Sequence, residues 1–130
     1  MKTKIIILTI VVVIAGGLIV LKLWPNLKPT SVSNLDPFVR CLTEKKAVLY
    51  GAFWCPHCQT QKEMFGSAAK QLPYVECSSP DGRSQLAVCQ EKKIEGYPTW
   101  EFADGSRLAA VTSLKALAEK TGCSLPTPTK

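Results

Sequence analysis

The chain has 130 residues, enough for one domain, and a formal net charge of +6 at pH 7. Lys2, Lys4 and Lys22 supply three of the positive charges, and elsewhere charges of both signs are mixed along the chain. The sequence therefore lacks the basic stripe that is typical of nucleic-acid binding, and we expect no nucleic-acid partner.

The N-terminal segment is typical of a membrane anchor. Residues 5–24 are predominantly apolar, and Lys22 is their one charged residue. As a helix they would extend about 30 Å, the thickness of the hydrocarbon core of a bilayer. The alternative is a cleaved signal peptide, but its apolar region is only about 7–15 residues long and precedes a small-residue cleavage site, which is absent here. We therefore expect one transmembrane helix in residues 1–24, contacting the bilayer through residues 5–24.

All six cysteines follow this segment, at positions 41, 55, 58, 77, 89 and 123. Six is high for a cytosolic protein and ordinary for an oxidising compartment. Lys2 and Lys4 favour a cytoplasmic N-terminus. Together these features predict a single-pass protein of the cell membrane (inner or plasma membrane, or thylakoid membrane) whose domain lies outside the cytoplasm.

A linker and the first elements of a domain follow the predicted anchor. Residues 25–35 are rich in Pro, Ser, Thr and Asn and are typical of a linker. A helix should begin with Asp36 as N-cap and Pro37 as its first residue. The apolar run 47–53 is typical of a strand buried on both faces, and a helix is expected at 56–71.

The second half of the domain continues with alternating elements. We expect, in order, a strand at 74–77, a helix at 82–93, strands at 98–103 and 107–111 joined by a turn at Asp104-Gly105, a helix from a cap at Thr112 or Ser113 to Gly122, and a flexible tail at 124–130. After the first helix the order is β-α-β-α-β-β-α. This order predicts an α/β domain at 36–123 whose first two strands are parallel.

Cys55 and Cys58 lie where the first strand meets the next helix. Structural zinc needs four ligands, typically two close pairs, and Cys55 and Cys58 are the one close pair of cysteines in the sequence. A structural disulfide between these two residues would close too small a loop to add much stability. A redox dithiol has a mechanism, because a helix N-terminus favours the thiolate of Cys55 and Cys58 can then resolve a mixed disulfide. We therefore predict a redox couple and no metal.

The two residues between the cysteines are suited to tuning this couple. Pro56 removes an N–H group that the start of a helix does not need. His57 can add a donor or a positive charge near the Cys55 thiolate and so stabilise the reduced form. A more stable reduced form makes the disulfide more oxidising.

Two motifs, "WCPHC" (54–58) after a strand and "GYPTW" (96–100) before the hairpin, resemble the thioredoxin family. The resemblance covers about residues 47–121 and implies a thioredoxin fold with an extra N-terminal helix, preceded here by the anchor. It implies a cis peptide bond before Pro98, which would face Cys55, Cys58 and His57 in the catalytic site. It also implies a substrate groove formed by Trp54, Pro56 and Tyr97, and no cofactor beyond the redox-active disulfide.

The Cys-Pro-His-Cys motif is the version seen in periplasmic oxidases of the DsbA type. The stretch 50–77 is similar to the thioredoxin-like domain fused to bacterial and plant vitamin K epoxide reductase homologues. This resemblance implies a thiol–disulfide oxidoreductase that forms or isomerises disulfides in secreted or membrane proteins. Because we find no four-helix reductase part in the sequence, a separate quinone-linked, vitamin K epoxide reductase-like membrane oxidase would re-oxidise it. Leu49 stands where thioredoxins have a buried acid, which fits a poor reductant.

Three other functions remain open at this point: a tethered thioredoxin-fold chaperone, a copper delivery or assembly factor, and a disulfide reductant. The remaining cysteines allow alternatives as well. Cys77 and Cys89 match a further pair of the fused domain, so the resemblance implies a structural disulfide, with an electron relay as the alternative. Cys41 and Cys123 have no counterpart, and either pair with each other or stay free.

Overall fold

The computed structural model describes residues 34–127. The predicted anchor at 1–24, most of the predicted linker and the last three residues lie outside this range. Within it, none of the helices has both the length and the apolar character needed to cross a bilayer. The anchor and its orientation therefore stay predictions.

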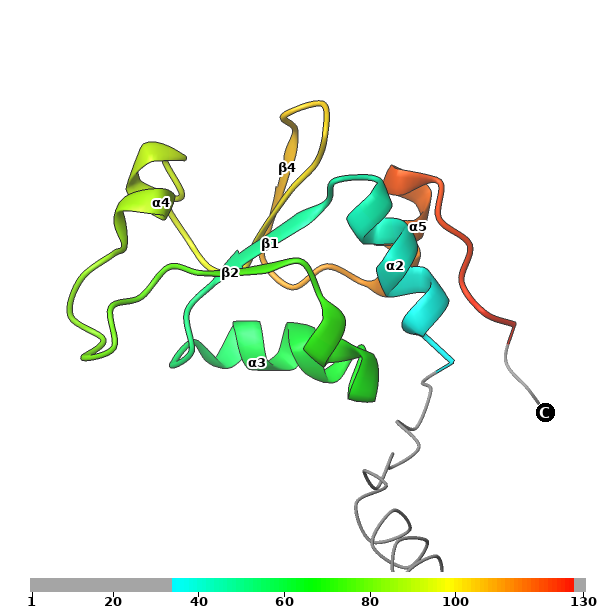
Figure 1. Ribbon diagram of the computed structural model, residues 1–130, viewed down its shortest axis with the longest axis horizontal. Coiled ribbons are helices and arrows are strands. Elements are labelled where there is room, and N and C mark those ends of the chain that lie inside the picture. Colours follow the sequence, from blue (N-terminus) through cyan, green and yellow to red (C-terminus); the bar gives the residue numbers. More distant parts are fainter. Residues whose placement is uncertain (1–33, 128–130) are drawn as a thin grey trace, which may run out of the picture. The chain divides into compact units, whose positions relative to one another are not determined.

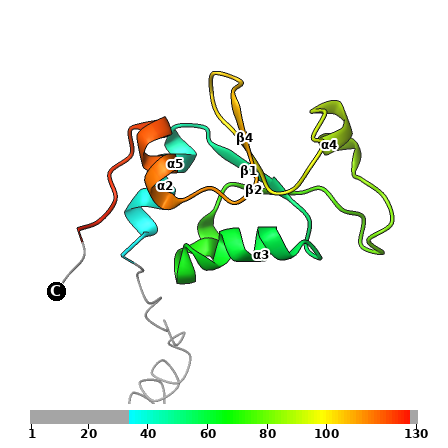
Figure 2. The ribbon, with the colours of Figure 1, turned by 180° about the vertical axis from the view of Figure 1, so that it is seen from behind.

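The described residues form a four-stranded sheet with helices packed around it (Figures 1 and 2). In chain order the elements are α2 (Asp36–Glu44), β1 (Val48–Gly51), α3 (Pro56–Glu63), the 3-10 helix η1 (Gly66–Gln71), β2 (Tyr74–Glu76), α4 (Ala87–Glu91), β3 (Thr99–Glu101), β4 (Arg107–Ala109) and α5 (Leu114–Thr121). A helix followed by β-α-β-α-β-β-α is the order predicted from the sequence, so the α/β fold class is confirmed.

The sheet has the strand order β2-β1-β3-β4. β1 runs parallel to β2 and antiparallel to β3, and β3 forms the hairpin with β4. In the parallel pair Leu49 lies opposite Tyr74, and Gly51 lies opposite Glu76. β1 is therefore an inner strand, and its carboxyl end leads directly into the turn that carries Cys55 and the start of α3.

The main core forms around Trp100 of β3. Phe65 packs against both Trp100 and Phe38, with 6.2 Å between ring centroids in each pair. Leu49 belongs to the same cluster, whereas its neighbour Tyr50 belongs to a smaller cluster. Successive residues of a strand point to opposite faces, so β1 is covered on both sides, as its continuous apolar run predicts.

Two predicted helices are shorter than expected. The helix predicted at 56–71 ends at Glu63, and Gly66 adopts a positive φ of 54°, after which the chain continues as the 3-10 helix η1. A positive φ is the left-handed conformation that glycine tolerates best, and it interrupts a right-handed helix. The prediction of a helix at 82–93 is wrong for its first half, because Gln85 pairs with Ser78 in an isolated β-bridge and α4 begins only at Ala87.

The helix caps also differ in one case. Asp36 is the first residue of α2 and not its N-cap, since Leu35 occupies the cap position. At α5 the cap is Ser113, whose Oγ accepts a hydrogen bond from the N–H of Ala116 at 3.1 Å. Gly122 ends α5 in the left-handed conformation, as predicted.

Two disulfides bridge the domain. One joins Cys41 of α2 to Cys123, just after α5, and these two helices lie side by side in both views (Figures 1 and 2). The other joins Cys77, directly after β2, to Cys89 of α4. The structure thus pairs Cys41 with Cys123, which the sequence alone left open.

We expect the two disulfides to differ in their contribution to stability. Their sequence separations are 82 and 12 residues. In the chain-entropy model the longer loop stabilises the fold by about 4.5 kcal/mol and the shorter one by about 3 kcal/mol. The double variant Cys41→Ala/Cys123→Ala should therefore lose more free energy of unfolding than Cys77→Ala/Cys89→Ala. Urea unfolding followed by circular dichroism measures both, and the reverse order would contradict the entropic account.

Candidate active site

Cys55 and Cys58 are positioned by the start of α3. Cys55 is the N-cap residue, Pro56 is the first residue of the helix, and the N–H of Cys58 donates a hydrogen bond to Cys55 Sγ at 3.4 Å. The aligned peptide dipoles of α3 add a partial positive charge at this end of the helix. This arrangement favours negative charge on Cys55.

The two sulfurs have different surroundings. Both side chains are buried, with exposed fractions of 5% for Cys55 and 1% for Cys58. Burial raises the pKa of the Cys58 thiol to about 12, although a hydrogen bond from the backbone of Ala52 opposes the rise. Cys58 is therefore held as a neutral thiol. Within residues 34–127 these are the two cysteines that take part in no disulfide.

The loop before β3 packs against this pair. The peptide bond between Tyr97 and Pro98 is cis. The thiol of Cys55 donates a hydrogen bond to the carbonyl oxygen of Tyr97, with 3.7 Å between sulfur and oxygen. Pro98 itself is fully buried, so the loop is fixed where it meets the reactive sulfur.

An exposed aromatic surface borders the cysteines. Phe53 and Trp54 are each 50% exposed, and the Trp54 indole packs edge-to-face with Tyr97. Trp54 Nε1 donates to Ser78 Oγ at 2.8 Å, which fixes the indole against the loop after β2. The sequence assigned Phe53 to the first strand, but β1 ends at Gly51. The sequence signal that could have indicated a surface role for Phe53 is its position as a large apolar residue directly before Trp54.

A small pocket continues this surface. It has a volume of about 180 Å³, and Trp54 and Tyr97 form one side of it. The rest of the lining comes from the chain between β2 and α4: Cys77, Ser78, Gly82, Arg83, Ser84 and Gln85. The sequence pattern predicts a helix at 82–93 and therefore does not identify this loop as part of the site.

The remaining predicted residues lie at the edge of the site or away from it. Pro56 and His57 are exposed, and within the described residues His57 makes no hydrogen bond or ion pair. Cys77 and Cys89 are fully buried and joined to each other, and the Cys41–Cys123 disulfide joins α2 to the chain just after α5. In residues 34–127 there is no group of three or more His, Cys, Asp or Glu side chains that could hold a metal ion.

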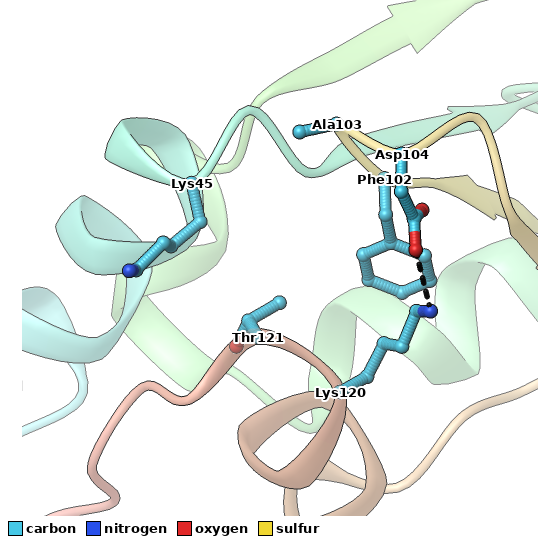
Figure 3. Close-up of a pocket in the computed structure, with 6 residues that line it drawn as sticks. All are labelled: Lys45, Phe102, Ala103, Asp104, Lys120 and Thr121. Atoms are coloured by element: carbon cyan, nitrogen blue, oxygen red, sulfur yellow. Dashed lines mark hydrogen bonds and ion pairs between the residues drawn. The ribbon is translucent and has the colours of Figure 1, made fainter.

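A larger pocket of about 210 Å³ lies near the end of α5 (Figure 3). Lys120 and Asp104 form an ion pair across it at 3.0 Å, while Lys45 and Phe102 line its other parts. Hydrogen bonds from Ser106, and then Lys120, hold the pKa of Asp104 well below its usual range. Neither free cysteine lines this pocket, so it is not part of the thiol site.

Gly51 sets the spacing beneath the active pair. A Cβ atom on this residue would lie 2.8 Å from Cys58 Sγ and 2.9 Å from Cε2 of Tyr74. Neither neighbour is the free end of a flexible chain, because the sulfur is fixed by α3 and the ring by β2. A glycine is therefore needed for α3 to approach β1 at this point.

Comparison with known proteins agrees with this geometry. Residues 27–121 match the sequence profile of the family described as Thioredoxin. The chain is 52% identical over 84 residues to "Thiol-disulfide oxidoreductase LTO1" of Arabidopsis thaliana, covering 61% of this chain and 22% of that protein. It is 33% identical over 82 residues to "Protein disulfide-isomerase A5" of Bos taurus, covering 56% and 16%. It is 32% identical over 76 residues to "Thioredoxin domain-containing protein 5 homolog" of Drosophila melanogaster, covering 55% and 18%. The chain thus spans about a fifth of the length of these curated relatives.

The packing at Gly51 predicts the effect of a single methyl group. Gly51→Ala should lower the free energy of unfolding by about 1–3 kcal/mol, because the added atom overpacks a filled site. Gly96→Ala is the matched control, since a Cβ there has no neighbour within 4 Å, and it should change stability by less than about 0.5 kcal/mol. Urea unfolding of both variants provides the test. Equal stability of the two variants would show that α3 can shift away from β1 at little cost.

Proposed function

The chain belongs to the thioredoxin family, and from this premise we propose that it is a thiol–disulfide oxidoreductase whose redox couple is Cys55–Cys58. One observation carries the proposal. The two free cysteines of the described residues stand at the N-terminus of α3, against the loop of the cis Tyr97–Pro98 bond. No cofactor is needed, because the disulfide itself accepts and donates the electron pair.

The geometry supports different roles for the two sulfurs. A substrate thiolate attacks Cys55 Sγ of the Cys55–Cys58 disulfide, the S–S bond breaks, and Cys58 receives the electron pair and a proton. A second substrate thiolate then attacks the substrate sulfur of the mixed disulfide, and Cys55 leaves as a thiolate. The N–H groups at the start of α3 stabilise that thiolate. The two substrate thiols are thereby oxidised to a disulfide, and Cys55 and Cys58 of the enzyme are left reduced.

The aromatic surface and the loop pocket are suited to holding an extended polypeptide next to Cys55. Trp54 and Tyr97 offer flat apolar area, and Pro56 is exposed directly after Cys55. Direct contact between substrate backbone and the loop of Pro98 would align the incoming sulfur with Cys55. The names of the relatives, an oxidoreductase and a disulfide isomerase, support protein thiols as the substrate class.

We place the enzyme at a membrane, as an oxidase or isomerase of secreted or membrane proteins. The apolar segment 5–24 supports a single-pass anchor, and two further disulfides in one small domain fit an oxidising compartment. The Cys-Pro-His-Cys motif supports the oxidising direction. A separate quinone-linked, vitamin K epoxide reductase-like membrane oxidase would return Cys55 and Cys58 to the disulfide.

The assignment of Cys55 as the attacked sulfur predicts which variant traps substrates. Cys58→Ser, expressed as the full chain in intact cells, should accumulate mixed disulfides with partner proteins, because nothing resolves them. Cys55→Ser should accumulate none. Non-reducing gels and mass spectrometry of the trapped species measure this.

The identity of the trapped partners tests the compartment as well. They should be secreted or membrane proteins with thiols or disulfides outside the cytoplasm. Equal trapping by Cys55→Ser would contradict the roles of the two sulfurs, and a set of cytosolic partners would contradict the placement of the domain.

The oxidising direction predicts the reduction potential of the couple. It should lie above the approximately −270 mV of thioredoxin and nearer the approximately −180 to −120 mV of disulfide isomerase and DsbA. His57→Ala should lower it by about 30 mV or more, because the exposed imidazole two residues after Cys55 can then no longer donate to the thiolate of the reduced form. Equilibration with glutathione buffers measures both potentials. A wild-type value at or below that of thioredoxin would make a disulfide reductant the better assignment.

A further inference from the structure

The Cys58 thiol has to exchange a proton in every turnover, although it is buried. When the Cys55–Cys58 disulfide opens, the Cys58 sulfur takes up a proton, and when the disulfide forms again this proton has to leave. At a pKa of about 12 the thiolate of Cys58 is rare at neutral pH. A proton partner within reach of the sulfur would therefore speed the reaction.

The hydroxyl of Tyr74 on β2 lies in reach. From the position that a Cβ of Gly51 would occupy, Cys58 Sγ is 2.8 Å away and the Tyr74 hydroxyl is 3.2 Å away. The sulfur and the hydroxyl are therefore at most about 6 Å apart, a gap that direct contact or one water molecule spans. No side chain lies between them at Gly51, because this residue has none.

A carboxylate stands behind the hydroxyl. Tyr74 donates a hydrogen bond to Oε2 of Glu76 at 2.9 Å. The other oxygen, Oε1, accepts from the backbone N–H groups of Phe53 at 3.2 Å and Ser78 at 2.9 Å, which fixes the carboxylate. Burial, and then the bond to Glu76, raises the pKa of Tyr74, so it remains a neutral phenol that can accept and donate at once.

The surroundings connect this pair to solvent. The ammonium of Lys62 lies 3.3 Å above the centre of the Tyr74 ring, and both residues line an open pocket of about 450 Å³. The titratable groups acting on Cys58 are thus Cys55 and Lys62 from α3 and Tyr74 from β2, with Glu76 behind Tyr74. Lys62 favours the Cys58 thiolate by its charge.

We propose that Tyr74 and Glu76 form a proton relay for Cys58, an inference that rests on the proposed oxidoreductase function. As the enzyme disulfide forms from a mixed disulfide, the Cys58 proton passes to the Tyr74 oxygen and the Tyr74 proton passes to Glu76. The Cys58 sulfur then attacks Cys55 Sγ, and the substrate sulfur leaves with the electron pair. When the disulfide opens, the same protons move back.

The register of the sheet explains why β2 supplies the relay. Leu49 of β1 lies opposite Tyr74 and is fully buried without any titratable atom. Tyr74 and Glu76, two residues apart on β2, point to the same face as Leu49 and Gly51. The neighbouring strand therefore brings a phenol and a carboxylate to a place where β1 offers neither.

The two steps of the thiol reaction can be separated with Ellman's reagent as the oxidant. The full chain, kept in mild detergent with Cys55 and Cys58 reduced, is mixed with the reagent in a stopped-flow instrument. Attack by Cys55 releases a first thionitrobenzoate, and attack by Cys58 on the mixed disulfide releases a second while the Cys55–Cys58 bond forms. The second phase reports the proton loss from Cys58.

Two variants remove the relay and keep the packing. Tyr74→Phe keeps the ring under Lys62, and Glu76→Gln keeps an oxygen for the N–H groups of Phe53 and Ser78. Each should slow the second phase at least 10-fold at pH 7 and leave the first phase unchanged. The defect should shrink as pH rises, because hydroxide then removes the Cys58 proton directly. Tyr50→Phe is the matched control, a buried tyrosine of the opposite cluster, and should slow neither phase.

Other outcomes would overturn the relay. A second phase as fast as wild type in Tyr74→Phe would do so, and this variant decides if Glu76→Gln fails to fold. Equal slowing of both phases, or a defect independent of pH, would indicate a structural role. Release of only one thionitrobenzoate by the wild-type chain would instead contradict the proposed function itself.

Discussion

The close approach of α3 to β1 at Gly51 is the constraint on which the rest of the site depends. It brings the sulfur of Cys58 under the start of its own helix and next to the ring of Tyr74. Because the sulfur is buried there, the reaction separates into an accessible step at Cys55 and a shielded step at Cys58. The same burial that protects the second thiol from solvent creates the need for a proton route.

Segments from separate parts of the sequence surround Cys55 and Cys58 and hold them in place. The carbonyl of Tyr97 contacts Cys55 from the loop before β3, and Ser78 fixes Trp54 from the loop after β2. The Cys77–Cys89 disulfide closes the second loop at its base. Precise placement of a reactive sulfur thus comes from three segments that meet at the carboxyl end of β1, as is usual in open α/β sheets.

Much of this arrangement could be predicted from local sequence. The order of elements, the position of Cys55 at a helix start and the hairpin after Pro98 all follow from short-range patterns. The failures came from tertiary contacts that no local pattern encodes. Gln85 bonds to the hydroxyl of Tyr97 and to the carbonyl of Ile94, so a stretch of helical periodicity became a loop. The contact of Tyr74 with Gly51 likewise depends on strand register, which the sequence alone did not reveal.

The Cys41–Cys123 bond has a mechanical consequence. It joins the first helix of the described domain to a residue just after its last helix, across a separation of 82 residues. Any tension between the chain before α2 and the C-terminal tail is therefore carried by covalent bonds and bypasses the hydrogen bonds of the sheet. A domain built in this way can be pulled from its ends without its strands separating, and Cys55 and Cys58 keep their geometry under load.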